Sequence, residues 1–403
     1  MPHFLYSPCS QLLSGKHFLP YIYKMKQTLS IILLFIGLSA MNAQQTINGS
    51  IVHDGITRTY ILYVPANYTG ATNVPLLLNF HGYGSNASQQ MAYGNFRPIA
   101  DTAGFLIVHP QGTLDNSNTT HFNVGWGGSA TDDLGFTDAL IDSLSANYTI
   151  DQSRIYSTGM SNGGFMSFHL ACNLSNRIAA IGSVTGSIVP FTLTNCNASH
   201  PTPVLQIHGT VDPTVPYNGG AGWSQAIPTL MTYWANYNNC DLPATTTAVP
   251  NINTTDGSTV EKIVYENGDN CVEVVHFKIT GGAHTWPGSA FPLSGTNYDI
   301  NASKEVWNFV SKYNLSGLID CPALELNENE SDVFDVYPNP SSGMVLLKGK
   351  FDSQTTYEIY DLRGVKISCG EVYESKIIDL SQLESAVYLI KIGSEMKQIQ
   401  LVK

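Results

Sequence analysis

Charged side chains are scarce in this 403-residue sequence, and the basic ones are scarcer than the acidic ones. Only 12% of the residues are charged, and 19 Lys and Arg residues stand against 31 Asp and Glu residues, for a formal net charge of -12. A chain with so few cations repels nucleic acids and anionic membrane surfaces. The composition therefore excludes nucleic acid as a partner and favours a neutral ligand, while 43% hydrophobic residues can build a large core.

The sequence also lacks an apolar run that comfortably crosses a bilayer. The run at residues 29–40 follows the basic start Met25-Lys26 and ends in small residues. This order is typical of a secretory signal peptide, because a membrane-spanning helix needs about 20 apolar residues. We predict a leader and signal peptide over residues 1–43 with the true start at Met25, an extracellular or surface-attached protein, and no membrane span in the mature chain. A membrane anchor is the alternative.

No Cys-x-x-Cys pair occurs, so the spacings of zinc-ribbon and thioredoxin-like sites are missing. We predict no metal and no cofactor. Six cysteines lie beyond the leader: Cys172, Cys196, Cys240, Cys271, Cys321 and Cys369. An even number in an exported chain indicates disulfides. Pairing nearest neighbours predicts Cys172–Cys196 and Cys240–Cys271, with Cys321 and Cys369 free.

Strand-like and helix-like segments alternate between residues 49 and 313. We predict strands over 57–64, 76–80, 105–108, 155–158, 204–208 and 272–279, and helices over 133–148, 162–171, 225–237 and 304–313. The short, almost wholly apolar strands are typical of central strands buried on both faces. The alternation predicts an α/β domain over residues 44–320, with a mostly parallel sheet and helices on both of its faces.

The pattern changes near residue 320. Residues 321–335 are acidic and poor in apolar side chains, so we predict a linker there. Short strands then follow over 345–348, 356–360, 365–368, 375–380 and 387–392, separated by Gly and Asp. They predict a small all-β sandwich domain over residues 336–403.

A Gly-x-Ser-x-Gly pentapeptide, centred on Ser161, follows the predicted strand 155–158 and opens the predicted helix 162–171. This strand–elbow–helix context is the setting of a nucleophilic serine. Glycines are needed there because the elbow puts Ser161 in a strained backbone conformation, in which neighbouring side chains would clash. The plainer alternative is a Gly-rich turn with an ordinary serine.

A serine hydroxyl needs a base, and the base needs an acid to orient it. Of the five histidines after Ser161, His284 alone lies in a loop after a predicted strand; the others are His169, His200, His208 and His276. Asp212 directly follows the strand 204–208, unlike Asp241, Asp256 and Asp269. We predict Ser161, Asp212 and His284 as a catalytic triad. A solvent-facing histidine and a turn-capping aspartate are the alternatives.

The second part of the predicted site is an oxyanion hole, for which we expect the backbone N–H groups of Tyr83 and Asn162. His81 is predicted to brace the loop before Tyr83 rather than to act as a second base. Trp126 and Trp286 are predicted to bind substrate by stacking on a sugar or phenolic ring, and a place in the core is the alternative. Asp132-Asp133 is interpreted as a helix cap rather than a metal site.

Six sequence blocks resemble the esterase and polyhydroxybutyrate depolymerase family, which includes feruloyl and acetylxylan esterases. They are Asp133-Leu134-Gly135-Phe136, Tyr148-x-Ile150-Asp151, Arg154-Ile155-Tyr156, Gly159-Met160-Ser161-Asn162-Gly163-Gly164, His208-Gly209-Thr210-x-Asp212 and Gly282-Ala283-His284-Thr285-Trp286-Pro287-Gly288. The resemblance covers residues 50–313 and implies the α/β-hydrolase fold with the same triad. Ala283 departs from the pattern, since a glycine is common there.

The C-terminal stretch resembles a type IX secretion sorting domain. The motifs are Tyr337-Pro338-Asn339-Pro340, Tyr360-Asp361-Leu362-Arg363-Gly364, Ile378-Asp379-Leu380, Tyr388 and Leu401-Val402-Lys403. This resemblance implies export across an outer membrane, with the type IX secretion machinery as a partner.

Together these features predict a secreted serine ester hydrolase that acts through an acyl-enzyme on plant cell-wall polysaccharide esters, such as feruloyl or acetyl esters. An extracellular polyhydroxybutyrate depolymerase is the alternative enzyme, although such enzymes usually carry an extra polymer-binding domain. A surface binding protein without catalytic activity is the alternative of another class.

Overall fold

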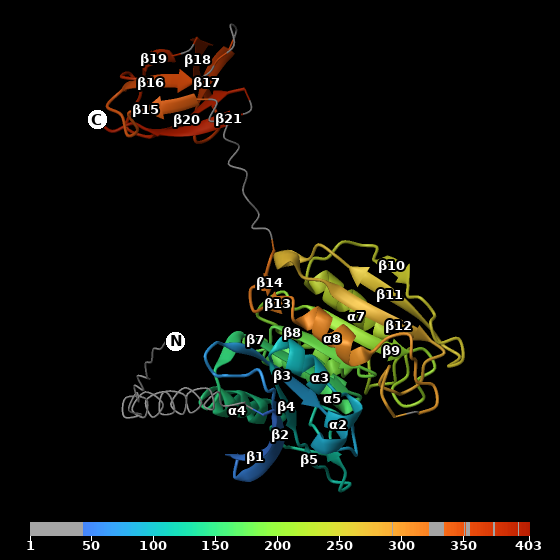
Figure 1. Ribbon diagram of the computed structural model, residues 1–403. Coiled ribbons are helices and arrows are strands. Elements are labelled where there is room, and N and C mark those ends of the chain that lie inside the picture. The colour runs from blue at the N-terminus through green and yellow to red at the C-terminus, as the bar shows by residue number, and fades with distance from the viewer. Residues whose placement is uncertain are drawn as a thin grey trace, which may run out of the picture. The chain divides into compact units, whose positions relative to one another are not determined.

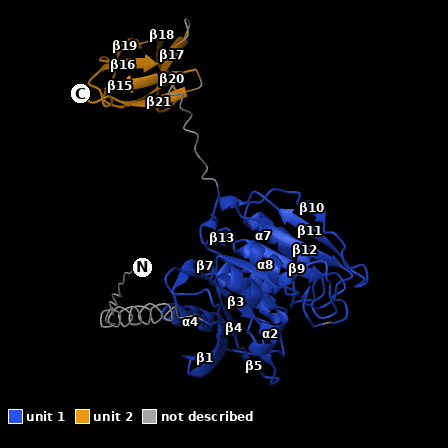
Figure 2. Cartoon of the chain, viewed as in Figure 1, with its two compact units in different colours: residues 1–321 blue, residues 322–403 orange. Residues whose placement is uncertain are grey.

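The computed structural model describes residues 43–403, apart from residues 292, 322–333, 350, 352–354, 374 and 394. Nearly all of the predicted leader and most of the predicted linker therefore lie outside the described residues. The chain divides into two compact units, residues 1–321 and residues 322–403 (Figure 2).

A ten-stranded sheet runs through the first unit in the order β1-β2-β4-β3-β7-β8-β9-β12-β11-β10 (Figure 1). Its strands are β1 (Gln45–His53), β2 (Ile56–Val64), β3 (Val74–Phe80), β4 (Leu106–Pro110), β7 (Ile150–Met160), β8 (Ala180–Val184), β9 (Val204–Gly209), β10 (Thr245–Ala248), β11 (Thr259–Tyr265) and β12 (Val274–Thr280). The central strands from β4 to β12 are parallel, and antiparallel strands flank them on both sides. Two short hairpins, β5 (Thr113–Leu114) with β6 (Thr120–His121) and β13 (Tyr313–Asn314) with β14 (Gly317–Leu318), lie outside this sheet.

Helices cover both faces of the sheet, as predicted. They are α2 (Ala87–Tyr93), α3 (Arg97–Ala103), α4 (Asp133–Ser145), α5 (Asn162–Asn173), α6 (Pro190–Thr194), α7 (Ile227–Tyr237) and α8 (Ala302–Val310). Alternate residues of a strand point to opposite faces. Leu76 and Leu78 of β3 accordingly join the core beneath α4, α5 and α7, whereas Leu77 joins the core beneath α3 and α8. Among the described residues, no helix combines the length and apolar character needed to cross a membrane.

Several elements have no counterpart in the sequence prediction. Strand β8 holds Gly182 and Ser183, which lower its β-propensity. The structure explains the glycine, because a Cβ at position 182 would lie 2.8 Å from a methyl carbon of Val306 in α8. The edge strand β10, its neighbour β11 and the short helices α2, α3 and α6 were also missed, since each is too short or too exposed to show a clear period.

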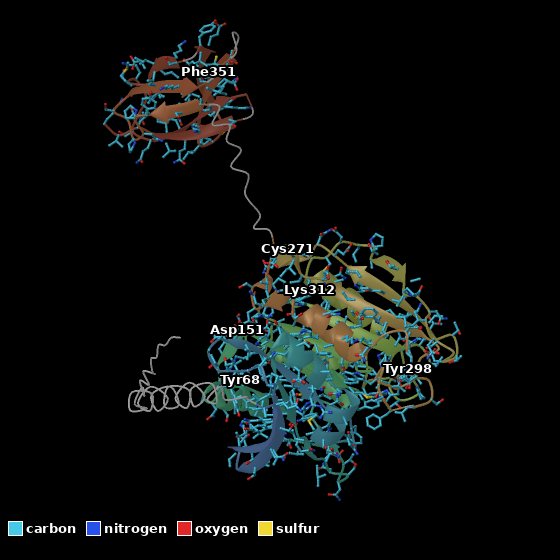
Figure 3. The ribbon with its side chains drawn as sticks, viewed as in Figure 1. Tyr68, Asp151, Cys271, Tyr298, Lys312 and Phe351 are labelled. Atoms are coloured by element: carbon cyan, nitrogen blue, oxygen red, sulfur yellow. A yellow bond between two sulfur atoms is a disulfide. The ribbon has the colours of Figure 1, made fainter. Side chains whose placement is uncertain are left out.

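The cysteine pairing was predicted correctly at one place and wrongly at the other. Cys172 and Cys196 form a disulfide, as expected, but Cys271 pairs with Cys321, and Cys240 is free and buried. Cys271 ends the short 3-10 turn η1 (Asp269–Cys271), which contacts β14, and Cys321 follows β14 (Figure 3). The fold thus brings Cys271 to a distant residue, while Cys240 directs its sulfur towards the Val272 carbonyl. The exposed Cys369 is free, as predicted.

The second unit contains two antiparallel sheets around one core. The first sheet has the order β15-β16-β19 and the second β18-β17-β20-β21. The strands are β15 (Phe334–Tyr337), β16 (Met344–Gly349), β17 (Thr355–Asp361), β18 (Lys366–Val372), β19 (Ser375–Asp379), β20 (Val387–Ile392) and β21 (Glu395–Gln400). Phe334 and Leu347 of the first sheet pack with Ile359 and Ile390 of the second. This arrangement is the small β-sandwich that the sequence predicts.

Candidate active site

Ser161 occupies a strained turn between β7 and α5. Its backbone has φ 54° and ψ -118°, a region that residues with a side chain seldom adopt. The turn is tight, since a Cβ at Gly163 would lie 2.1 Å from the carbonyl oxygen of Phe80 in the neighbouring strand β3. The Ser161 N–H donates to the Val184 carbonyl at 2.9 Å and anchors the turn to β8. The glycines beside Ser161 therefore allow the turn to present one hydroxyl at the start of a buried helix.

Asp212 and His284 lie at the carboxyl ends of adjacent strands, β9 and β12, and form a direct hydrogen bond. His284 Nδ1 lies 2.7 Å from Asp212 Oδ2, and the other carboxylate oxygen accepts from the N–H groups of Thr214 and Val215, at 2.8 Å each. Burial by itself would raise the pKa of Asp212, but the hydrogen bonds from His284 and Val215 outweigh it and hold the pKa below its usual range. The Asp212 carboxylate is therefore ionised at neutral pH and orients the imidazole.

Ser161 and His284 line the same cavity, although no hydrogen bond joins the Ser161 hydroxyl to His284 in the structure. Such bonds are often long before substrate binds. The structure thus brings the three predicted residues to one place and joins two of them directly.

The loop after β3 approaches the serine closely. A Cβ at Gly82 would lie 3.4 Å from Ser161 Cβ. Within the described part of the chain, neither the Tyr83 N–H nor the Asn162 N–H donates to a protein acceptor, so both remain available to an oxyanion. The Asn162 side chain is occupied, because its amide bonds the N–H and the carbonyl of Phe122 at 2.7 Å and 3.0 Å.

His81 braces this loop, as predicted. Its Nε2 accepts from the Gly112 N–H at 3.0 Å, which leaves the proton on Nδ1, and Nδ1 donates to the Gly82 carbonyl at 2.8 Å. Burial lowers the pKa of His81 to about 4, so the ring is neutral at neutral pH. Both nitrogens are committed to backbone groups, which leaves this ring no capacity to act as a base.

The cavity beside Ser161 has a volume of about 460 Å³. Apolar side chains from three segments line most of it: Ala92, Tyr93, Met160, Phe291 and Leu293. Polar groups stand at Ser85, Gln89 and Gln90. Sequence reasoning missed this lining, because it comes from α2 and from the loop after His284, and neither segment has a motif or a period that indicates a pocket.

The two predicted substrate-binding tryptophans have different surroundings. Trp286 is only 1% exposed, packs edge-on against Phe96 and donates from Nε1 to the Ser303 hydroxyl at 3.1 Å. It is a core residue, and its prediction as a substrate residue was wrong. Trp126 is partly exposed and lies beside Tyr83, with their ring centroids 6.3 Å apart. Tyr83 in turn lines the cavity, so Trp126 contacts one of the lining residues without lining the cavity itself.

Asp132 and Asp133 have structural roles. Asp132 caps α4 by accepting from the Gly135 N–H at 2.9 Å. Asp133 is buried in an ion pair with Arg58 and accepts from the Asn123 N–H at 2.7 Å. These contacts agree with the interpretation of Asp132-Asp133 as the cap of a helix.

Segments of both units match known families. Residues 132–250 match the phospholipase/carboxylesterase family, and residues 335–403 match the secretion system C-terminal sorting domain. The first match covers β7, the serine turn, α5 and Asp212; the second covers the β-sandwich.

Individual relatives are esterases. A bifunctional acetylxylan esterase/xylanase of Neocallimastix patriciarum is 29% identical over 275 residues, which cover 68% of this chain and 36% of the relative. A probable feruloyl esterase C of Aspergillus clavatus is 34% identical over 179 residues, which cover 44% of this chain and 62% of the relative. The chain thus spans less than two thirds of the length of either relative.

Among solved structures, the acetyl xylan esterase from Aspergillus awamori has a TM-score of 0.46 and 14% identity, and the match covers 66% of this chain and 99% of that one. The strand order and the serine turn are consistent with the two family matches. The first unit therefore holds a mostly parallel α/β sheet and a segment that matches the phospholipase/carboxylesterase family, and the second unit matches a secretion-system sorting domain.

Proposed function

We propose that this protein is a serine esterase that releases acyl groups from plant cell-wall polysaccharides, with an aromatic acyl group of the feruloyl type as its preferred substrate. Ser161 attacks the ester carbonyl while His284 takes the hydroxyl proton, and Asp212 stabilises the resulting imidazolium. The Tyr83 and Asn162 N–H groups receive the oxyanion. His284 then protonates the leaving sugar alcohol. Water, deprotonated by His284, attacks the acyl-enzyme, and His284 returns the proton to the Ser161 oxygen.

The observation that carries the proposal is the apolar cavity beside Ser161 and the Asp212–His284 pair. Its volume of about 460 Å³ lies in the range of small-molecule sites. An acetyl group would occupy a small part of this space and leave apolar surface in contact with water. An aromatic acyl group would cover the surfaces of Tyr93, Met160 and Phe291 and gain the free energy of their burial. The feruloyl and acetylxylan esterases among the relatives support both acyl classes.

The polar lining residues of the cavity support an aromatic acyl group with a phenolic substituent. The Ser85 hydroxyl donates to Gln89 Oε1 at 2.9 Å, which fixes the Gln89 amide and leaves its NH₂ group available. That group is a donor suited to a phenolic or methoxy oxygen.

The first experiment asks whether Ser161 is the nucleophile. A fluorophosphonate probe should label the wild-type chain and fail to label Ser161→Ala. Ser85→Ala is the matched control, because Ser85 lines the same cavity and its loss should leave labelling intact. A labelled Ser161→Ala chain would remove the assignment, and an unlabelled wild type would favour the binding protein without catalytic activity.

The second experiment asks which acyl group is preferred. Hydrolysis of methyl ferulate, acetylated xylan and short hydroxybutyrate oligomers should be compared at equal enzyme concentration. We expect the highest kcat/KM on the ferulate, by tenfold or more, which corresponds to about 1.4 kcal/mol. A preference for acetylated xylan would restrict the proposal to acetyl esters, and a preference for the oligomers would replace it by polyester hydrolysis.

A further inference from the structure

A second histidine contacts the Asp212 turn. His208 lies in β9, four residues before Asp212, and its side chain is fully buried. Its Nε2 lies 2.8 Å from the Val215 carbonyl oxygen and 3.4 Å from Asp212 Oδ2. The same Oδ2 atom lies 2.7 Å from His284 Nδ1. The buried Asp212 carboxylate therefore stands between two imidazole rings.

The hydrogen bonds around His208 determine where its proton lies. Gln206 Nε2 lies 2.9 Å from the Gly186 carbonyl, which can only accept, so the amide group of Gln206 is at this position. The same nitrogen lies 2.8 Å from His208 Nδ1, and Nδ1 must therefore accept. Burial lowers the pKa of His208 to about 4 and keeps the ring neutral. The remaining proton is on Nε2, directed at Val215 and Asp212.

The turn that follows β9 is held from both sides. Asp212 Oδ1 accepts from the N–H groups of Thr214 and Val215, and the carbonyl of Val215 accepts from His208 Nε2. Without His208, the Val215 carbonyl would lose its hydrogen-bond donor inside the protein, and the turn would be free to relax. Asp212 would then lose the geometry that directs Oδ2 at His284.

We propose that His208 is a positioning residue, whose Nε2–H holds the 212–215 turn and thereby keeps Asp212 aimed at His284. This inference rests on the proposed triad. The network continues away from the site, because the Gln206 carbonyl accepts from His276 Nδ1 at 3.1 Å, and His276 Nε2 accepts from the Tyr217 hydroxyl at 3.0 Å. Gln206 is thus fixed at its backbone as well as at its amide.

The test compares His208→Asn with His208→Gln, using the second-order rate of fluorophosphonate labelling. This rate reports the activation of Ser161 and does not depend on the identity of the natural ester. Asparagine is too short to place a donor at the Nε2 position, whereas the longer glutamine amide can reach it. We expect His208→Asn to slow labelling by tenfold or more and His208→Gln to retain at least a third of the wild-type rate.

The same change in an Asp212→Asn background separates positioning from core packing. Because His208 acts through Asp212, His208→Asn should slow labelling of Asp212→Asn by less than twofold. An equal loss in both backgrounds would mean that His208 only packs the core, and an undiminished rate in the single variant would also overturn the inference. Unlabelled wild-type protein would instead count against the proposed function.

A measurement on the wild-type chain covers the case in which a variant fails to fold. The ¹⁵N shifts of the imidazole nitrogens of His208 near pH 7 should show a neutral ring protonated on Nε2. A ring protonated on Nδ1, or on both nitrogens, would contradict the hydrogen-bond assignment on which the inference depends.

Discussion

Trp126 is the residue for which we expect a contact with the sugar part of the substrate. Its ring packs edge-on against Phe165 at 4.9 Å between centroids, and its Nε1 donates to the Trp223 carbonyl at 3.2 Å. The two residues that follow it are Gly127 and Gly128, and a Cβ at either position would meet no other atom within 4 Å, so the backbone beside the indole borders open space. A ring in this position suits contact with the alcohol part of the ester, which is the sugar, while the acyl group fills the cavity.

We therefore expect Trp126→Ala to raise the KM for feruloylated xylan by about tenfold, near the upper end of what a ring contact contributes. The KM for methyl ferulate, which has no sugar, should rise less. Trp126→Phe is the control, since it keeps a ring against Phe165. Steady-state kinetics on both substrates checks this, and an equal rise in both KM values would assign Trp126 to the acyl pocket or to packing alone.

Residues at strand ends could be predicted from the sequence, whereas residues that face a cavity from loops could not. Asp212 and His284 were found because each follows a buried strand, and parallel strands end at the same edge of a sheet. Trp286 was misjudged because its place near His284 in sequence does not reveal its direction, and the ring turns into the core against Phe96. Phe291 lies in the same loop and lines the cavity, without any pattern that distinguishes it from Trp286.

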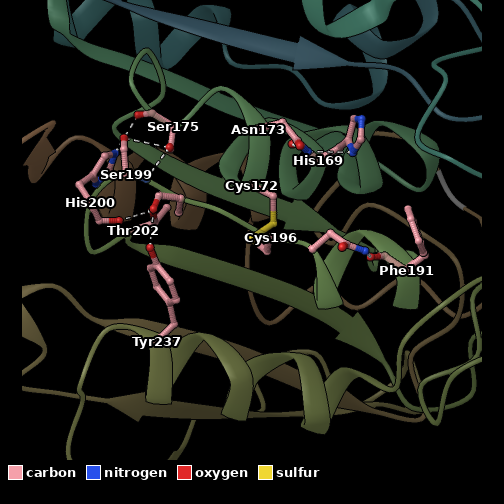
Figure 4. Close-up of a disulfide and its surroundings, with 12 residues drawn as sticks. His169, Cys172, Asn173, Ser175, Phe191, Cys196, Ser199, His200, Thr202 and Tyr237 are labelled. Carbon is pink, nitrogen blue, oxygen red and sulfur yellow. Dashed lines mark hydrogen bonds between the residues drawn. A yellow bond between two sulfur atoms is a disulfide. The ribbon is translucent and has the colours of Figure 1, made fainter.

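At the scale of elements, the Cys172–Cys196 disulfide ties the end of α5 to the segment after α6 (Figure 4). The sequence separation is 24 residues, and closing such a loop in the unfolded chain stabilises the fold by about 3 kcal/mol. The Ser161 end of α5 is held separately, because the Ser161 N–H donates to the Val184 carbonyl of β8.

We therefore expect Cys172→Ala/Cys196→Ala to lower the free energy of unfolding by about 3 kcal/mol. Turnover at 25 °C should change by less than twofold, because the serine turn keeps its own anchor. Urea unfolding followed by tryptophan fluorescence measures the change, since all five tryptophans precede residue 308 and so report only the first unit. Cys369→Ser, an exposed free cysteine in the second unit, is the control. Unchanged stability of the double variant would contradict the loop-closure argument.

Elements were predictable where the side-chain pattern was strong. The central strands appear in the sequence as short apolar runs because both of their faces are buried, and α5 was found from the serine motif that precedes it. The second disulfide could not be predicted, because the fold, and not the spacing, brings η1 next to the segment after β14.

At the scale of the whole molecule, acid should act on the two units differently. All 11 histidines precede residue 285, so the second unit has none. Burial lowers the pKa of His81 and His208 to about 4 and that of His276 to about 3. Because these folded-state values lie below the unfolded value of about 6.5, the unfolded chain takes up protons first as the pH falls. Stability is therefore lost between about pH 6.5 and pH 4, and is retained above that window.

Each of these histidines should lower the free energy of unfolding by roughly 1.4 kcal/mol per pH unit inside that window. We expect the urea midpoint seen by tryptophan fluorescence to fall steeply between about pH 7 and pH 5. The unfolding of the second unit, followed by calorimetry, provides the comparison within the same molecule and should lack this histidine contribution. A first-unit midpoint that stays constant over this range would show that the buried rings are protonated in the folded state.

The two units have separate cores, which predicts that the esterase domain can fold and act alone. The first unit has two hydrophobic clusters, one around β3 and α5 and one around β3 and α8, and their buried residues lie within 62–313. The buried residues of the third cluster, in the second unit, lie within 334–401. A chain that ends at Cys321 keeps the Cys271–Cys321 disulfide and the β13–β14 hairpin. We expect it to hydrolyse methyl ferulate with a kcat/KM within twofold of the full chain.

A chain that ends at Lys312 is the control, because it loses the hairpin, the disulfide and the buried Tyr313, whose carbonyl accepts from the Tyr156 hydroxyl at 2.7 Å. This shorter chain should unfold at a lower temperature in calorimetry. An inactive chain ending at Cys321, beside an active full chain, would contradict this prediction. The sorting domain would then have to contribute to the folding or the activity of the first unit.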